Sequence, residues 1–299
     1  MDENSSITPF YSVLDSRHMF EKNYSNVPKF ICIGAQKAGT TWLADILDLH
    51  PNFWNPGIKE IHFFDQVSPE SNSLDSKFAK NLLKRLRKKS HQGYKEIPVQ
   101  LAARNEYTFT LEDYFSLFSN CPSGRISWEI TPAYASMTEA QVHYMTQLLP
   151  ESKYLFIIRS PYERAVSQWR MLISRKFEHI AFDETKMNKK FDHWISKNSL
   201  NRGKYSSIIK TYAKYVDLQK QFLFLPFGEL KTNPQSFLGK VYKYLNVTEY
   251  YPTVANSPSH ITQKHKISEY ISDRLRVLTA EESIFLENFF GEKFAKDCL

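Results

Sequence analysis

Long apolar runs are absent from this sequence of 299 residues. No stretch approaches the roughly eighteen consecutive apolar residues that mark a membrane-spanning helix. The beginning of the chain, MDENSSITPFYSVLDSRHMF, is polar and acidic, unlike the basic and then apolar start of a secretory signal. We therefore expect a protein without a membrane span and, by default, a cytoplasmic one.

Cysteine is scarce, and the three positions Cys32, Cys121 and Cys298 show neither CxxC nor metal-ligand spacing. Cys32 lies within an apolar strand pattern, where a small buried core residue is the simplest interpretation. This usage favours a reducing compartment, and we expect no metal site.

Signatures of nucleic-acid-binding modules are also missing: there is no zinc-finger spacing, no RNA-binding aromatic signature and no basic zipper. A formal net charge of +7 and a pI near 9.0 nevertheless favour anionic ligands. Part of the excess lies in KRLRKKS, residues 84–90. This run is either a solvated helix end or loop, or a patch that steers an anionic substrate or nucleic acid. We expect no nucleic acid partner.

Internal repeats, low-complexity tracts and Gly/Ser linkers are lacking, which favours one domain at 29–299 after an N-terminal extension at 1–28. Alternating strand and helix patterns predict an α/β fold, a P-loop-like and mostly parallel central sheet flanked by helices. The expected strands are 29–35, 59–65, 125–134, 153–161 and 221–230. The expected helices are 41–49, 74–88, 111–119, 138–149, a helix from 162, 205–220 and 234–245. Residues 178–203 are interpreted as a loop-rich lid or acceptor-binding insertion.

The stretch GAQKAGTT, residues 34–41, has the outline of a phosphate loop between a buried strand and a helix. A nucleoside-triphosphate loop would continue after Gly39 with Lys and then Ser or Thr. Here Thr40 and Thr41 follow, and the lysine, Lys37, lies inside the loop. No apolar strand ends in an Asp that could hold magnesium. The pattern favours an anion cradle without magnesium, such as one for a 5′-phosphosulfate, over an ordinary glycine turn.

Four motifs in the order of one family then carry a resemblance. The sequence is similar to sulfotransferases that use 3′-phosphoadenosine 5′-phosphosulfate (PAPS), and nearest in motif to the heparan-sulfate type. The resemblance covers about residues 29–245. Its motifs are FICIGAQKAGTTWLADILDLHPNF, the pair KEIHFFD and EITPAY, FIIRSPYERAVSQW, and GKYSSIIKTYAKYVDLQKQFLFLPFGELKTNP.

The resemblance implies PAPS as co-substrate, released as 3′,5′-adenosine bisphosphate, with no metal required. Arg159 and Ser167 would bind the 3′-phosphate, Tyr205 would lie near the nucleotide, and Lys264, with Lys266, would belong to a basic closing loop. Other interpretations are a surface salt bridge for Arg159, half-buried packing for Tyr205 and a plain exposed loop for Lys264. The phosphosulfate loop itself would contribute Gly34, Gln36, Lys37, Ala38, Gly39, Thr40, Thr41 and Trp42.

The implied chemistry is in-line transfer of a sulfuryl group to an acceptor hydroxyl or amine. Lys37 would offset charge on the leaving phosphate oxygen, and Glu60 would act as the base. His62, two residues along an expected strand and so on the same face, is a reserve base because histidine titrates near neutral pH. Glu129 and Thr131 share a strand face and would contact the acceptor or orient Lys37.

Two positions depart from the family pattern. Ile130 stands where a lysine usually follows the glutamate, which suggests a different acceptor class, and Ser160 replaces a common acidic residue. The acceptor is expected to be a carbohydrate or a small molecule. Two rival hypotheses stay open: a P-loop nucleotide kinase, and a non-catalytic module that binds polyanions through the basic run at 84–89.

Overall fold

The computed structural model describes residues 27–104, 107–176, 183–197, 199–256 and 265–299. By its internal contacts the chain divides into two compact units, each made of three chain segments. Unit 1 comprises Met1–Ile33, Leu47–Tyr154 and Thr211–Phe222, and unit 2 comprises Gly34–Ile46, Leu155–Lys210 and Leu223–Leu299. Each unit is described by itself below. The expected domain limits of 1–28 and 29–299 stay predictions.

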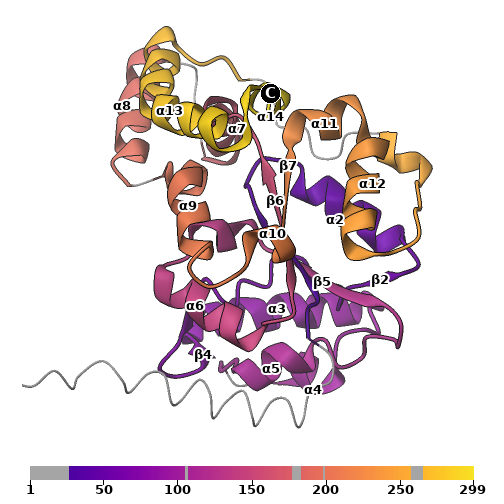
Figure 1. The fold of residues 1–299 in the computed structure, drawn as a ribbon. Helices are drawn as coiled ribbons and strands as arrows, with labels where there is room; N and C mark the ends of the chain where they lie inside the picture. Colours follow the sequence, from indigo (N-terminus) through magenta and orange to yellow (C-terminus); the bar gives the residue numbers. More distant parts are fainter. Residues whose placement is uncertain (1–26, 105–106, 177–182, 198, 257–264) are drawn as a thin grey trace, which may run out of the picture. The chain divides into compact units, whose positions relative to one another are not determined.

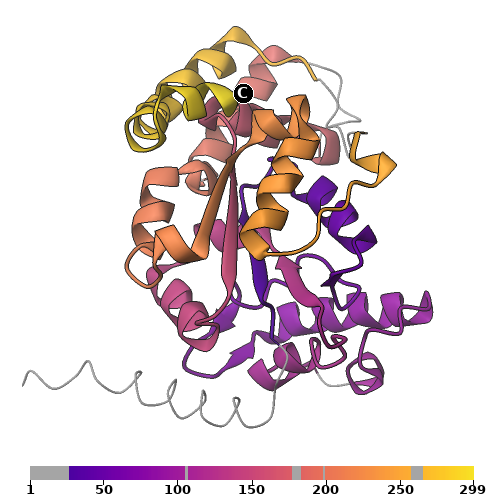
Figure 2. The ribbon, with the colours of Figure 1, turned by 45° about the vertical axis from the view of Figure 1, so that its right-hand side comes forward.

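Five strands form the central sheet in the order β2-β5-β1-β6-β7 (Figures 1 and 2). β1 pairs in parallel with β5, with Phe30 opposite Trp128, and β2 also pairs in parallel with β5. The fold class is confirmed: the protein is α/β, with a mostly parallel sheet flanked by helices. These strands form because their apolar runs can be buried on both faces. Their bounds are β1 (Phe30–Gly34), β2 (Phe53–Trp54), β5 (Ile126–Ile130), β6 (Lys153–Ile158) and β7 (Phe222–Pro226).

The expected strand at 59–65 is wrong, because these residues form a loop. Glu60 and His62 have φ values of 55° and 61°, which lie in the left-handed region and cannot continue a strand. The alternation also fails, since the adjacent Phe63 and Phe64 are both fully buried. One edge of the sheet is formed instead by the short β2, which was not predicted.

Unit 1 also contains helices α3 (Ser76–His91), α4 (Val99–Ala103), α5 (Leu111–Ser116), α6 (Glu139–Leu148) and α10 (Leu218–Gln221), the 3-10 turn η1 (Pro132–Ser136), and a hairpin of β3 (Val67–Ser68) and β4 (Ser73–Leu74). α3 begins after Asp75, whose carboxylate accepts a bond from the backbone N–H of Lys77. Its apolar positions Leu82, Leu83 and Leu86 are buried, whereas Lys84 and Lys88 are exposed.

The other helices lie wholly in unit 2, except that the last residues of α2 and α9 belong to unit 1. These are α2 (Thr40–Leu49), α7 (Pro161–Lys176), α8 (Glu184–Ile195), α9 (Tyr205–Tyr212), α11 (Phe227–Thr232), α12 (Pro234–Leu245), α13 (Glu269–Phe290) and α14 (Glu292–Asp297), with the 3-10 turns η2 (Asn201–Gly203) and η3 (Thr253–Asn256). α7, α8 and α13 pack together through a cluster that includes Trp169, Phe191 and Leu275 (Figure 1).

Two sequence predictions in this region need correction. Residues 178–203 are not simply loop-rich, since α8 forms there among the described residues, and its Phe191 packs at right angles to Trp169. Its role as a lid or acceptor-binding insertion stays a prediction. The single helix expected at 205–220 is two helices, α9 and α10, separated by a turn after Tyr212.

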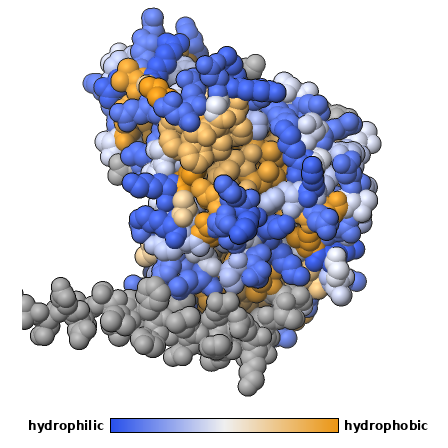
Figure 3. Space-filling model, in the orientation of Figure 1, coloured by the Kyte–Doolittle hydropathy of each residue, from blue (hydrophilic) through white to orange (hydrophobic). Residues whose placement is uncertain are grey.

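An aromatic surface lies at the end of α13 and on α14. The rings of Phe289, Phe290 and Phe294 lie against one another, and the Phe289 side chain is exposed. Figure 3 shows apolar side chains gathered on this part of the surface. Among the helices of the described ranges, none combines the length and the apolar character needed to cross a membrane.

Candidate functional site

The phosphate loop of unit 2 connects β1 to α2 through an irregular turn. Lys37 and Gly39 have φ values of 72° and 78°, so both adopt the left-handed conformation. Gly39 also has no room for a side chain, because an added Cβ would lie 2.8 Å from Cδ1 of Leu230. Thr40 begins α2, so the positive end of the helix dipole meets the loop. This is the backbone arrangement that binds anions at helix N-termini.

Arg159 follows β6 directly and contacts this loop. Its Nη1 donates to the carbonyl of Lys37 at 2.8 Å, and its guanidinium lies 4.7 Å from the centre of the Phe227 ring. Nη2 lies 3.5 Å from the carboxylate of Glu163, so Arg159 forms a salt bridge in addition to its contact with the loop. Nε is buried and has no hydrogen-bond partner among the residues the structure describes. The strand-end arginine and the glycine loop are therefore one cluster.

Positive charge is concentrated in this part of unit 2. Burial lowers the pKa of Lys37, and the charges of Arg159 and Arg175 lower it further. Arg164 is 1% exposed, and this burial also lowers its pKa. The positive charges of Arg202 and Arg159 act in the same direction. Cations that raise one another's free energy are stabilised when an anion binds between them. Ser167, on α7, is buried in the same unit.

Sequence reasoning missed Arg164. Its Nη1 donates to Oε1 of Gln168 at 2.7 Å, while Nε, within the described part of the chain, has no partner. Gly203 packs on the guanidinium so closely that an added Cβ would lie 2.6 Å from Nε. The sequence shows only that Arg164 lies between Arg159 and Ser167 in the motif RSPYERAVS. That position does not indicate that its side chain is buried.

The remaining donor-side residues are placed as follows. Tyr205 is fully buried, and its hydroxyl donates to the carbonyl of Arg159 at 2.8 Å. Trp42 is also buried, and its Nε1 donates to the carbonyl of Ala255 at 3.1 Å. Oε1 of Gln36 is buried and, in the described ranges, without a partner. Lys264 lies outside the described residues, and Lys266 is exposed just before α13.

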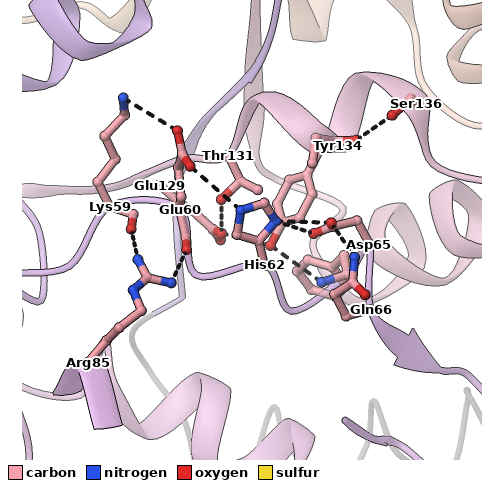
Figure 4. A network of polar contacts seen from close by, with 12 residues as sticks. Lys59, Glu60, His62, Asp65, Gln66, Arg85, Glu129, Thr131, Tyr134 and Ser136 are labelled. Atoms are coloured by element: carbon pink, nitrogen blue, oxygen red, sulfur yellow. Dashed lines mark hydrogen bonds and ion pairs between the residues drawn. The ribbon is translucent and has the colours of Figure 1, made fainter. Parts of the chain in front are cut away.

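The candidate base lies in unit 1, within the loop at 59–65 (Figure 4). Oε2 of Glu60 lies 3.6 Å from Nε2 of His62, and Nδ1 of His62 lies 3.0 Å from Oδ2 of Asp65. The imidazole therefore stands between two carboxylates. Asp65 is nearly buried, whereas the Glu60 side chain is 44% exposed and accessible from solvent.

These contacts change the protonation of the pair. Burial by itself lowers the pKa of His62, but the hydrogen bonds and charges of Asp65 and Glu60 outweigh burial and raise it to about 9. The hydrogen bond from His62 lowers the pKa of Glu60, against the opposing effect of burial. At neutral pH the histidine is therefore protonated and Glu60 is ionised, so only Glu60 can accept a proton.

Long-range contacts hold the loop in place. The backbone N–H of Glu60 donates to the carbonyl of Ile130 at 3.1 Å. Arg85, from α3, donates to the carbonyl of Glu60 at 2.7 Å and also to that of Lys59 (Figure 4). Nothing in the sequence distinguished Arg85 for this contact, because it is one of several cations in the run at 84–90.

Glu129 and Thr131 lie inside unit 1, and both are fully buried. The Glu129 carboxylate accepts bonds from the hydroxyls of Tyr114, of Tyr134 at 2.7 Å and of Thr131 at 2.8 Å. Burial raises the pKa of Glu129, while these three donors oppose the rise. The Tyr134 hydroxyl also accepts from the N–H of Phe64 at 3.4 Å, which connects this network to the loop at 59–65.

Comparison with known proteins identifies the family. The family model of the sulfotransferase domain matches residues 27–288. The chain belongs to the sulfotransferase family. Its curated relatives include enzymes of the heparan-sulfate type, so the resemblance drawn from the motifs is confirmed.

Three relatives show the extent of the similarity. Human heparan sulfate glucosamine 3-O-sulfotransferase 3B1 is 23% identical over 251 residues, covering 82% of this chain and 51% of the relative. Mouse heparan sulfate glucosamine 3-O-sulfotransferase 5 is 26% identical over 230 residues, covering 74% of this chain and 54% of the relative. Bifunctional heparan sulfate N-deacetylase/N-sulfotransferase 1 of Caenorhabditis elegans is 23% identical over 234 residues. The match covers 75% of this chain and 23% of the relative. The chain spans about half the length of these 3-O-sulfotransferases.

Solved structures share the fold. A sulfotransferase from Alicyclobacillus acidocaldarius matches with a TM-score of 0.58 at 19% identity, covering 88% of this sulfotransferase-family chain and 95% of the other. The sulfotransferase domain of the Synechococcus PCC 7002 olefin synthase matches with a TM-score of 0.51 at 16% identity, covering 90% and 96%.

Proposed function

We propose that this protein transfers a sulfuryl group from PAPS to a hydroxyl or amine of a carbohydrate or small-molecule acceptor, without a metal. The observation that carries the proposal is the hydrogen bond from Arg159 to the Lys37 carbonyl, which joins two partly buried cations in the unit that also contains the buried Arg164. This contact brings together the two motifs that the family resemblance assigns to the two ends of one nucleotide.

The residues of unit 2 fit the chemistry of such a donor. When bound, PAPS supplies an activated sulfuryl group and leaves as 3′,5′-adenosine bisphosphate. The backbone of the loop, with Thr40 and Thr41, binds the 5′ end, and Lys37 offsets charge there. Arg159 and Ser167 bind the 3′-phosphate. Nε of Arg159 is buried and has no hydrogen-bond partner among the described residues. This supports the assignment, because phosphate oxygens accept strong hydrogen bonds from a guanidinium.

Glu60 is the proposed base of the reaction. It is ionised and accessible, whereas His62 already carries a proton at neutral pH. His62 therefore acts as the charged partner that holds the Glu60 carboxylate, and Asp65 holds His62. Glu129 and Thr131 support the loop from within through Tyr134.

A carbohydrate acceptor is favoured by the curated relatives, which are named for action on heparan sulfate glucosamine. Ile130 is fully buried in β5, so the position where the family usually has a lysine offers no cation to the acceptor. We therefore propose an acceptor whose recognition does not depend on that cation. The compartment stays a prediction.

The polyanion-module hypothesis loses part of its basis. Arg85 and Arg87, the two arginines of the run at 84–90, donate to backbone carbonyls of unit 1. Their guanidinium groups therefore hold α3 to neighbouring segments of unit 1, a role that neither of the two interpretations of this run included. The module hypothesis still predicts steeply salt-dependent polyanion binding that survives Lys37→Ala.

Calorimetric titration with 3′,5′-adenosine bisphosphate in magnesium-free buffer, with ATP as comparison, tests the proposal. We expect binding of the bisphosphate with ATP far weaker. Arg159→Ala should reduce bisphosphate affinity by about 10- to 150-fold, because a hydrogen bond to a charged group contributes ~1.5–3 kcal/mol. Arg276→Ala, which removes an exposed cation of α13, is the matched control. Magnesium-dependent preference for ATP would instead support the kinase hypothesis.

A further inference from the structure

One peptide group in unit 2 is held at both of its polar atoms. The carbonyl of Arg159 accepts from the hydroxyl of Tyr205 at 2.8 Å. The N–H of Ser160, which belongs to the same peptide group, donates to the carbonyl of Cys298 at 2.8 Å. Tyr205 and Cys298 are both fully buried. The peptide plane that follows the strand-end arginine is therefore set by two residues far from it in the sequence.

The second of these contacts depends on how residues 297–299, here called the tail, pack against α11. An added Cβ at Gly228 would lie 2.3 Å from the backbone oxygen of Asp297, so only glycine allows this approach. Nζ of Lys231 donates to the carbonyl of Leu299. The tail is thus fixed to α11 at two points along its length.

The same short helix also borders the donor residues. Phe227, at the start of α11, lies under the Arg159 guanidinium, with 4.7 Å between guanidinium carbon and ring centre. Leu230 and Phe227 also border Gly39 of the phosphate loop. α11 therefore contacts the tail on one side and both proposed phosphate-binding motifs on the other.

We propose that the tail is a positioning element of the donor site: by holding the Arg159–Ser160 peptide group, it sets the direction in which Arg159 presents its guanidinium. The proposal rests on the proposed function of Arg159 as the 3′-phosphate ligand. A guanidinium binds phosphate through planar, directed donors, so a change in its orientation weakens binding more than a loss of charge at a distance would. The contact with the tail is made by the backbone N–H of Ser160, at a position where the family commonly has an acidic residue.

Gly228→Ala tests the proposal, because the new methyl group must displace the Asp297 carbonyl and with it the tail. Its matched control is Gly239→Ala in α12, where an added Cβ would meet the ends of two side chains, Tyr251 at 3.1 Å and Glu249 at 3.8 Å, and no backbone. Affinities for 3′,5′-adenosine bisphosphate and for adenosine 5′-monophosphate, which lacks the 3′-phosphate, are compared by competition titration. We expect Gly228→Ala to weaken bisphosphate binding about tenfold, the equivalent of one lost directed contact, and to leave the monophosphate unchanged.

Lys231→Met provides a second test that adds no bulk to the fold. It removes the contact with Leu299 and also the cation that lies 5.3 Å from the centre of the Phe227 ring. We expect the same selective loss, smaller in size. If both variants fold and keep the wild-type ratio of the two affinities, whether both affinities stay the same or both fall equally, the proposal is overturned. If Gly228→Ala does not fold, the ratio measured for Lys231→Met decides. A wild-type protein that shows no preference for the bisphosphate would instead contradict the proposed function itself.

Discussion

At the scale of single residues, the chemistry depends on which groups carry a proton. His62 lies between Glu60 and Asp65, and their negative charges keep it protonated well above neutral pH. The histidine that the sequence offered as a reserve base is therefore better suited to orient the glutamate.

The first prediction concerns Glu60. Glu60→Gln keeps the shape of the side chain but removes its ability to accept a proton. We expect turnover to fall by about 10²- to 10⁴-fold, with bisphosphate affinity nearly unchanged. Steady-state sulfuryl transfer to an accepted substrate and calorimetry measure the two quantities, and Glu70→Gln, an exposed carboxylate of unit 1, is the control. A Glu60 variant that keeps its rate while His62→Asn loses it would reverse the assignment.

The second prediction concerns the pH dependence of stability. The pKa of His62 is about 9 in the folded protein and 6.5 ordinarily, so unfolding releases its proton between these values. Its stabilising contribution is complete below pH 6.5 and is lost as the pH rises through about 9. The difference in unfolding free energy between the wild type and His62→Asn should therefore shrink over this range. Urea denaturation at a series of pH values measures it, and a difference independent of pH would contradict the assignment.

At the scale of secondary structure elements, helices hold the irregular segments that carry the candidate residues. α3 does so for the loop at 59–65 through Arg85, which donates to two consecutive carbonyls. The expected strand at 59–65 was predicted from alternation alone, and alternation does not include the tertiary contacts that stabilise left-handed residues. The helix expected at 138–149 agrees with α6, whose start is set locally by a capping box of Thr138 and Gln141.

The third prediction follows from this contact. Arg85→Met keeps the aliphatic part of the side chain and removes both hydrogen bonds to the loop. We expect turnover to fall about tenfold or more, since a displaced base is poorly oriented, while bisphosphate affinity stays the same. Lys84→Met, the exposed neighbour on α3, is the control. Equal effects of the two substitutions would show that only the charge of α3 matters.

The fourth prediction concerns the packing of α8 in unit 2. Phe191 is fully buried against Trp169 and Trp194. Phe191→Ala should lower the free energy of unfolding by about 3–5 kcal/mol, because it removes an aromatic ring and leaves a cavity. Chemical denaturation measures the loss, and Lys189→Ala on the exposed face of α8 should change it little. A loss no greater than that of the control would mean that α8 is not part of the core of its unit.

At the scale of the whole molecule, local sequence determined the α/β class, the strands of the central sheet other than β2, the phosphate loop and the arginine that follows β6. Each is encoded within a few consecutive residues, by buried apolar runs, by glycines that allow left-handed backbone, or by helix caps. The family resemblance was readable for the same reason, because its motifs are short and contiguous.

Only tertiary structure decided which groups hold these motifs. It placed Arg159 on the Lys37 carbonyl, Arg85 on the loop at 59–65, Tyr114 and Tyr134 on Glu129, and the Cys298 carbonyl on the N–H of Ser160. Each of these contacts joins positions distant in the sequence, and its energy comes from burial and from the pairing of polar groups. Neither composition nor periodicity records such pairs, because both are properties of neighbours along the chain.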